Sequence, residues 1–314
     1  MPLHPQAKAE LEFIRSLGVP ENNTQTPQQA RQGHIDRRPA DPPAPEAVHY
    51  VEDREIPGPA GNLKVRVYRP SDDDGLPMLL GIHGGGWVLG DVITEDGSMR
   101  GLVNGAQCLA VSVEYRLSPE VRFPEPLDDC YSTLEWMADH ASELGGDASR
   151  LAVAGTSAGG NLSAAVALKA RDEGGPKLCH QVLFTPVTDH DFTTDSYKSC
   201  GEGYFLTQDS MQWFWDHYIG PDGDPHNPLA SVLRATDLSG LPAATVITAE
   251  YDPLRDEGES YSASLSAAGV DTVCTRYDGM IHGFNLQPAK LTDGRKALNE
   301  ASARLRASFG IRSM

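Results

Sequence analysis

Ser157 stands in a stretch whose residue types could do nucleophilic chemistry, since residues 155–160 read Gly-Thr-Ser-Ala-Gly-Gly. The apolar run at 151–154 before it is typical of a buried strand, and residues 161–168 after it favour a helix. A G-x-S-x-G motif between a strand and a helix is typical of a nucleophile elbow, which exposes the serine on a strained turn. Side chains at the two motif glycines would collide with that strand and helix. The pattern predicts a nucleophilic Ser157; the alternative is an ordinary helix-capping serine.

Three consecutive glycines follow an apolar run at 77–82, in the stretch His-Gly-Gly-Gly-Trp at residues 83–87. Glycines leave backbone N–H groups uncovered, so a substrate oxygen can approach them closely. A loop of this type is the usual oxyanion partner of a nucleophile elbow, although a flexible turn is the alternative. We expect His83 to anchor the loop by hydrogen bonding rather than to act as a base.

Two further side chains follow the last two expected strands. Asp252 stands before a proline in a loop that can aim a carboxylate inward, and His282 lies in a loop next to a glycine. The order Ser…Asp…His predicts a catalytic triad of Ser157, Asp252 and His282, with His282 as the base and Asp252 orienting it. Glu250 is the rival carboxylate, whereas Asp256 is expected to cap the next helix.

These side chains need a sheet whose strands end at one common edge. Strands are expected at residues 48–56, 63–68, 77–82, 108–114, 151–154, 181–184, 244–248 and 272–277. Helices are expected at residues 5–17, 126–140, 159–173, 256–268 and 291–308. The alternation predicts an α/β protein with a mostly parallel, eight-stranded sheet and helices on both faces.

Composition narrows the class of protein. The chain has 314 residues and a net charge of −18, which disfavours nucleic acid and anionic membrane partners. No apolar run approaches the length of a membrane span, and residues 1–10 lack the apolar core of a signal peptide. The five cysteines are scattered and form no C-x-x-C pair. We therefore expect a cytoplasmic protein with free thiols, without membrane insertion, and with no metal or organic cofactor.

Taken together, the motifs resemble those of the hormone-sensitive-lipase-like esterases, a family of α/β-hydrolases. The matches fall within residues 77–285, in the order typical of the family. Thr156 departs from the aspartate that many members carry before the serine, and resembles a GTSAGG branch of the family. The matching stretches are His83-Gly84-Gly85-Gly86-Trp87, Tyr115-Arg116-Leu117-Ser118-Pro119-Glu120, Phe123-Pro124, the elbow, Asp252-Pro253-Leu254-Arg255-Asp256 and His282-Gly283-Phe284.

The resemblance implies an α/β-hydrolase fold with a helical cap. Residues 1–46 and 190–238 would form the cap, and residues 47–189 and 239–314 the catalytic domain. The family also implies short-chain acyl esters as substrates, and often homodimers. It further implies that the backbone N–H groups of Gly85, Gly86 and Ala158 form the oxyanion hole, since sequence alone does not select which amides converge.

The expected insertion at 190–238 contains an aromatic helix candidate at residues 208–218. Successive residues of a helix point about 100° apart, so Trp213, Phe214 and Trp215 cannot all face one way. At least one ring should enter the substrate pocket, with Trp87 as the opposite wall; the alternative is that all three only hold the cap on the body. Two other activities stay open: an amidase or deacetylase with the same triad, and a non-catalytic small-molecule receptor, which the presence of His282 disfavours.

Overall fold

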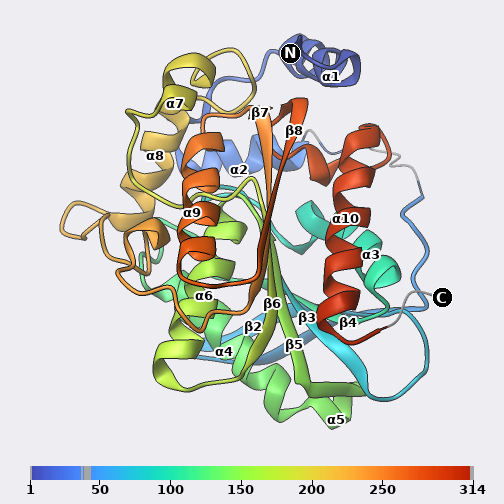
Figure 1. Ribbon diagram of the computed structural model, residues 1–314. Coiled ribbons are helices and arrows are strands. Elements are labelled where there is room, and N and C mark those ends of the chain that lie inside the picture. Colours follow the sequence, from blue (N-terminus) through green and yellow to red (C-terminus); the bar gives the residue numbers. More distant parts are fainter. Residues whose placement is uncertain (1, 37, 39–43, 312–314) are drawn as a thin grey trace.

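The computed structural model describes residues 2–36, 38 and 44–311. In this part of the chain one eight-stranded sheet has the order β1-β2-β4-β3-β5-β6-β7-β8 (Figure 1). β2 is antiparallel to β1 and β4, and all other neighbouring strands are parallel, which confirms the predicted fold class. The strands are β1 (Tyr50–Gly58), β2 (Gly61–Arg69), β3 (Leu76–Ile82), β4 (Leu109–Glu114), β5 (Gly146–Thr156), β6 (Leu178–Phe184), β7 (Ala243–Tyr251) and β8 (Thr272–Ile281).

The helices include all six that the sequence predicts, counting the aromatic candidate at residues 208–218, and several that it does not. The α-helices are α1 (Pro5–Ser16), α2 (Pro27–Asp36), α3 (Val92–Ala106), α4 (Glu125–Asp139), α5 (Ala141–Leu144), α6 (Ala158–Glu173), α7 (Asp195–Cys200), α8 (Gln208–Ile219), α9 (Arg255–Ala267) and α10 (Thr292–Ser308). Three short 3-10 helices are η1 (Asn22–Thr24), η2 (Val232–Arg234) and η3 (Phe284–Leu286). Within the described residues, no helix is long and apolar enough to cross a membrane.

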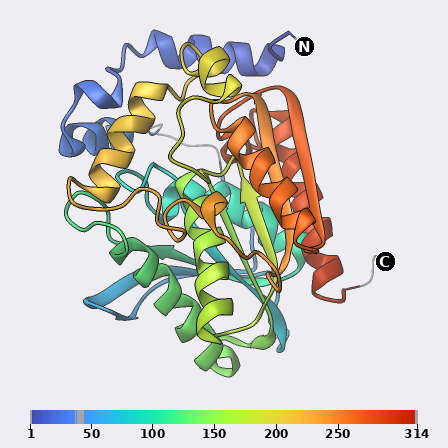
Figure 2. The same ribbon diagram turned by 60° about the vertical axis from the view of Figure 1, so that its left-hand side comes forward.

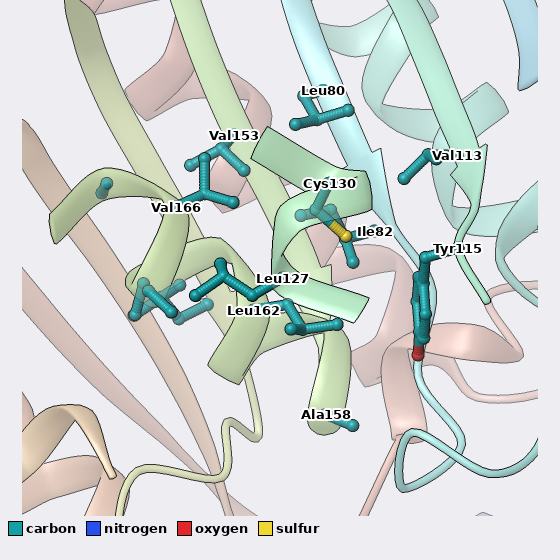
Figure 3. Close-up of a cluster of buried hydrophobic side chains, with 14 of the residues drawn as sticks. Leu80, Ile82, Val113, Tyr115, Leu127, Cys130, Val153, Ala158, Leu162 and Val166 are labelled. Carbon is teal, nitrogen blue, oxygen red and sulfur yellow. The ribbon is translucent and has the colours of Figure 1, made fainter. Parts of the chain in front are cut away.

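Helices cover both faces of the sheet. α3 and α10 lie on one face, and α4, α6 and α9 lie on the other (Figure 1). Figure 3 shows the second face, where Val153 of β5 packs in a buried cluster with Leu127 of α4 and Leu162 of α6. Burial of such aliphatic side chains stabilises the fold by about 1.5–3 kcal/mol each. The core therefore fixes the ends of β3 and β5, where the predicted oxyanion loop and nucleophile begin.

α3 was not predicted because its three glycines lower helix propensity. Two of them serve packing against α10. A Cβ at Gly101 would lie 3.0 Å from Leu298, and one at Gly105 would lie 2.4 Å from the Ser302 hydroxyl. The missing side chains let the two helices approach closely, so α3 is held firmly against the sheet.

The elements outside this framework gather over the carboxyl end of the parallel strands. In both ribbon views α1, α2, α7 and α8 lie together at that end of the molecule (Figures 1 and 2). Arg31 of α2 donates to the backbone oxygens of Val88 and Ser118, and it pairs with Glu120 at 2.6 Å. Of the proline-rich stretch before β1, residues 39–43 lie outside the described residues.

The two ends of the segment from 190 to 238 lie close together in space. The Leu233 amide donates to the Thr188 carbonyl at 2.9 Å, and Arg234 pairs with Asp189 at 2.5 Å. These contacts join the two ends of the segment just beyond β6. β6 and β7 are therefore neighbouring parallel strands even though this long segment lies between them in the sequence.

Candidate active site

A sharp turn between β5 and α6 carries Ser157. The serine backbone has φ 60° and ψ −119°, a strained conformation that costs on the order of 1–3 kcal/mol. Its amide donates to the Phe184 carbonyl at 2.9 Å, which holds the turn against β6. A Cβ at Gly155 would lie 2.3 Å from the Gly159 carbonyl, and one at Gly159 would lie 2.1 Å from the Ile82 carbonyl. Only glycine fits at both positions.

The structure brings Ser157, Asp252 and His282 together from the ends of β5, β7 and β8. The Ser157 Oγ lies 2.9 Å from His282 Nε2, and His282 Nδ1 lies 2.8 Å from Asp252 Oδ2. The Leu254 amide donates to the other Asp252 oxygen at 2.9 Å. Asp252 is fully buried, whereas Ser157 is 8% and His282 7% exposed. The serine and the imidazole therefore reach solvent, and the carboxylate behind them does not.

The other two carboxylates of this region point elsewhere. Glu250 Oε2 accepts a hydrogen bond from the Gly279 amide at 2.7 Å, within the β7–β8 pair. Asp256 accepts from the Ser196 amide at 2.7 Å, so it stabilises the start of α7 instead of capping its own helix. Asp252 is thus the carboxylate that the fold places on the imidazole.

The glycine loop after β3 lies beside the serine turn. A Cβ at Gly84 would lie 2.8 Å from the Thr156 carbonyl, and one at Gly85 would lie 2.3 Å from the Leu89 carbonyl. Gly85 and Gly86 have φ of 115° and 59°, where glycine avoids the strain that other residues would suffer. Within the described residues, the amides of Gly85, Gly86 and Ala158 donate no hydrogen bond, so they are available to an incoming oxygen.

His83 is buried beneath this loop. Its Nδ1 lies 2.8 Å from the Gly84 carbonyl oxygen, and its ring stacks on Tyr115 at 4.2 Å between centroids. Burial lowers the pKa of His83 to about 4, so the ring is neutral at ordinary pH. The Tyr115 hydroxyl donates to the His83 carbonyl, which fixes the start of the loop. His83 shapes the loop and does not contact the serine.

The predicted aromatic wall is partly wrong. Trp87 is 0% exposed, with its ring stacked on Tyr218 at 4.1 Å and tilted against Trp215 at 4.7 Å, so it offers no surface to a pocket. Trp215 is also buried in this stack. Phe214 lies against the oxyanion loop, since a Cβ at Gly86 would lie 2.3 Å from its ring. Trp213 is partly buried beside Phe214.

One group near the site went unnoticed in the sequence. Glu95 of α3 is buried directly below the glycine loop and the serine turn, where its carboxyl oxygens meet Gly84 and Thr156. A signal was available, because Glu95 interrupts the apolar positions Val92, Met99 and Leu102 of an amphipathic helix. Recognising it requires knowing that residues 92–106 are helical.

Nothing in the described part of the chain suggests a metal centre, since no group of three or more His, Cys, Asp or Glu side chains could hold an ion. The arrangement that does exist has three parts: a serine hydrogen-bonded to an imidazole, a buried carboxylate behind it, and free backbone amides beside it. Such an arrangement can attack a carbonyl carbon and stabilise the resulting oxyanion.

Comparison with known proteins identifies the family of the chain. Residues 79–286 match a family described as having the alpha/beta hydrolase fold. The carboxylic ester hydrolase LipN of Mycobacterium tuberculosis is 44% identical over 273 residues, covering 84% of this chain and 72% of LipN. An arylesterase of Saccharolobus solfataricus is 42% identical over 235 residues, 74% of each chain.

Solved structures extend the similarity to nearly the whole chain. A thermostable esterase from Pseudomonas putida ECU1011 superposes with a TM-score of 0.93 at 40% identity, covering 98% of each chain. An ester hydrolase from the Lake Arreo metagenome, solved with a bipyridine phosphonate derivative, gives a TM-score of 0.92 at 39% identity, covering 98% of this chain and 99% of that one. The chain therefore belongs to the α/β-hydrolase family, among its hormone-sensitive-lipase-like esterases.

Proposed function

We propose that this protein is a carboxylesterase that hydrolyses short-chain acyl esters through an acyl-enzyme on Ser157. The observation that carries the proposal is the continuous hydrogen-bonded chain from Ser157 through His282 to Asp252, with unpaired amides beside the serine. Its relatives include a carboxylic ester hydrolase and an arylesterase, which supports ester hydrolysis as the reaction.

The first half of the reaction transfers the acyl group to the enzyme. His282 Nε2 takes the hydroxyl proton as Ser157 Oγ attacks the ester carbonyl. Asp252 holds the imidazole with Nδ1 protonated and Nε2 free to accept, and it stabilises the imidazolium that forms. The same proton then passes from His282 to the departing alcohol. Water, deprotonated by His282, releases the acid in the second half.

The negative charge of each tetrahedral intermediate falls on the former carbonyl oxygen. We assign its stabilisation to the amides of Gly85, Gly86 and Ala158, because they lie beside Ser157 and have no partner within the described residues. Donors fixed before the reaction need no reorganisation, and one such donor is worth about 3–4 kcal/mol.

The elements above the site would act as a cap that limits substrate length. We propose that residues 1–46 and 190–238 form this cap over the catalytic domain of residues 47–189 and 239–314. Phe214 lies against Gly86, so a long acyl chain cannot extend straight past the oxyanion loop. Each methylene that gains no apolar contact forgoes about 0.8 kcal/mol of binding, which favours short acyl chains.

A panel of p-nitrophenyl esters of increasing acyl length, assayed beside the matching anilides, tests the proposal. We expect turnover of the short esters, little turnover of anilides, and complete loss in Ser157→Ala with an unchanged thermal unfolding curve. A fluorophosphonate should label Ser157 stoichiometrically, and Ser163→Ala serves as a matched control. A preference for anilides would make the protein an amidase, and full activity in Ser157→Ala would refute the nucleophile.

Two properties of the whole molecule complete the proposal. The family resemblance favours a homodimer, and among the described residues no strand pairs with the outer edge of β8. Light scattering of the purified chain measures its oligomeric state.

Free thiols favour a reducing, cytoplasmic compartment. The free cysteines are Cys108, Cys130, Cys179, Cys200 and Cys274.

A further inference from the structure

Glu95 is a buried carboxyl group without a positive partner. Its residue is 3% exposed, and within the described residues no lysine or arginine forms an ion pair with it. A buried carboxylate loses hydration that hydrogen bonds alone replace only in part, so such a residue costs stability. A neutral side chain would fill the same space at lower cost. Its presence calls for a role other than stabilising the fold.

The partners of Glu95 come from two of the loops that build the site. The Gly84 amide, at the start of the oxyanion loop, donates to Oε1 at 3.2 Å. The Thr156 hydroxyl, next to the nucleophile, lies 3.4 Å from Oε2. One carboxylate therefore contacts both the loop that holds the oxyanion donors and the turn that holds the serine.

The third loop joins through the same hydroxyl. The Asn285 side-chain amide donates to Thr156 Oγ1 at 2.8 Å, and Asn285 stands three residues after His282. The hydroxyl accepts this hydrogen bond with a lone pair, which leaves its own proton free to be donated to Glu95 Oε2. A chain of polar contacts thus runs from Asn285 through Thr156 to Glu95 and ends at Gly84.

The helix that carries Glu95 is itself anchored to the histidine loop. The Ser98 hydroxyl, one turn further along α3, donates to the Asn285 carbonyl at 3.0 Å. α3 also packs closely on α10 through its glycines. The network therefore rests on α3 and connects it to the oxyanion loop, the end of β5 and the short 3-10 helix η3.

We propose that Glu95 is a positioning residue for ester hydrolysis, which holds the oxyanion loop, the nucleophile turn and the histidine loop in mutual alignment. This proposal rests on the proposed function, because it concerns the same site. The effect acts on geometry: reacting groups must be held within a fraction of an ångström, and a shift of about 1 Å costs on the order of 10²-fold in rate.

Two buried ionisable groups close to Glu95, Tyr115 and His83, do not change charge in the pH range where Glu95 ionises. Burial raises the pKa of Glu95 to about 7, against the lowering effect of the contacts from Thr156 and Gly84. Burial raises the pKa of Tyr115 well above its ordinary value, and it lowers that of His83 to about 4. Both neighbours are therefore uncharged where Glu95 ionises.

Substitution of Glu95 tests the proposal by separating kcat from KM. Above pH 7, where Glu95 is ionised, Glu95→Gln keeps an acceptor for the Gly84 amide but offers Thr156 a donor in place of an acceptor, so kcat should fall about tenfold. Glu95→Ala removes both contacts and should lower kcat on the order of 10²-fold, with KM within about twofold of the wild type. Thermal unfolding of Glu95→Gln should occur no earlier than in the wild type. An unchanged kcat, or a loss that follows a lower Tm, would overturn the proposal.

Thr156 provides a matched pair of variants. Thr156→Val removes the hydroxyl while keeping the branched shape at the end of β5, and it should reproduce the kcat loss of Glu95→Gln. Thr156→Ser keeps the hydroxyl and should retain most of the activity. Equal activity in the two variants would show that the hydrogen bonds of the Thr156 hydroxyl do not contribute to kcat.

Hydrogen exchange tests the alignment without any turnover. The segment 83–90 should exchange faster in Glu95→Ala than in the wild type, whereas the segment 127–138 of α4 should not change. If the wild type hydrolysed no ester and did not react with the fluorophosphonate, the proposed function would fail. The exchange result would still decide whether Glu95 holds the loop, and equal exchange in segment 83–90 would refute that role.

Discussion

The stability of this protein should depend on pH through Glu95, and Glu95→Gln should remove that dependence. Burial raises the pKa of Glu95 from its ordinary value of 4.5 to about 7. The folded protein thus holds this proton more tightly than the unfolded chain does. As pH rises through this interval, the unfolded chain releases the proton first, so the free energy of unfolding decreases.

The two pKa values set the size of the effect. A tenfold difference in proton affinity corresponds to about 1.4 kcal/mol, so ionised Glu95 should lower the free energy of unfolding by about 3 kcal/mol above pH 7. The contribution is absent below pH 4.5, where both states carry the proton. The glutamine variant cannot ionise, so any cost of its altered hydrogen bonding is a constant offset across this range.

Urea unfolding of both proteins at several pH values between about 5 and 8 measures the difference. Other groups that titrate here, including Glu257, whose pKa burial also raises, occur in both proteins and cancel. The variant should gain stability relative to the wild type as pH increases, with most of the gain between about pH 5 and pH 7. Parallel curves would show that Glu95 does not titrate differently in the folded state and would refute the reasoning.

Four further substitutions address the site and the helices above it. Asp252→Asn should lower kcat on the order of 10⁴-fold and Glu250→Gln only slightly; the reverse order would reassign the orienting carboxylate. Phe214→Ala should extend the acyl-length profile of kcat/KM to longer chains, whereas an unchanged profile would contradict its place beside the oxyanion loop. Arg31→Ala removes contacts to Val88, Ser118 and Glu120 and should lower the free energy of unfolding by about 1–3 kcal/mol, as measured by urea titration. Equal urea midpoints for the variant and the wild type would show that these contacts of α2 do not stabilise the fold.

The parts of the fold that depend on local pattern were predictable. The apolar run of β5 and the small residues of α6 lie next to each other in the sequence, so the strained serine between them could be located without a structure. The order of Asp252 and His282 after successive strands was equally visible. Carboxyl ends of parallel strands meet at one edge, which makes such an arrangement follow from topology.

The parts that depend on distant partners were not predictable. α3 contains three glycines and gains its stability from α10, which lies almost two hundred residues later in the chain. Without that helix there was no reason to notice Glu95. Trp87 was expected in the pocket because it adjoins Gly86, yet its ring has a better partner in Tyr218, and no periodicity within residues 83–87 reveals a contact with α8.

The stacking of Trp87 on Tyr218 has a consequence for how substrate enters and product leaves. Gly86 and Trp87 are consecutive, so the contacts of Trp87 with Tyr218 and Trp215 join α8 directly to the oxyanion loop. A hinge movement of α8 away from the sheet would therefore displace the oxyanion loop and move its backbone amides out of their catalytic positions. Substrate access that keeps the oxyanion loop in its catalytic geometry therefore requires α8 to stay in place. Tryptophan emission, sensitive to Trp87 and Trp215, would stay constant during turnover.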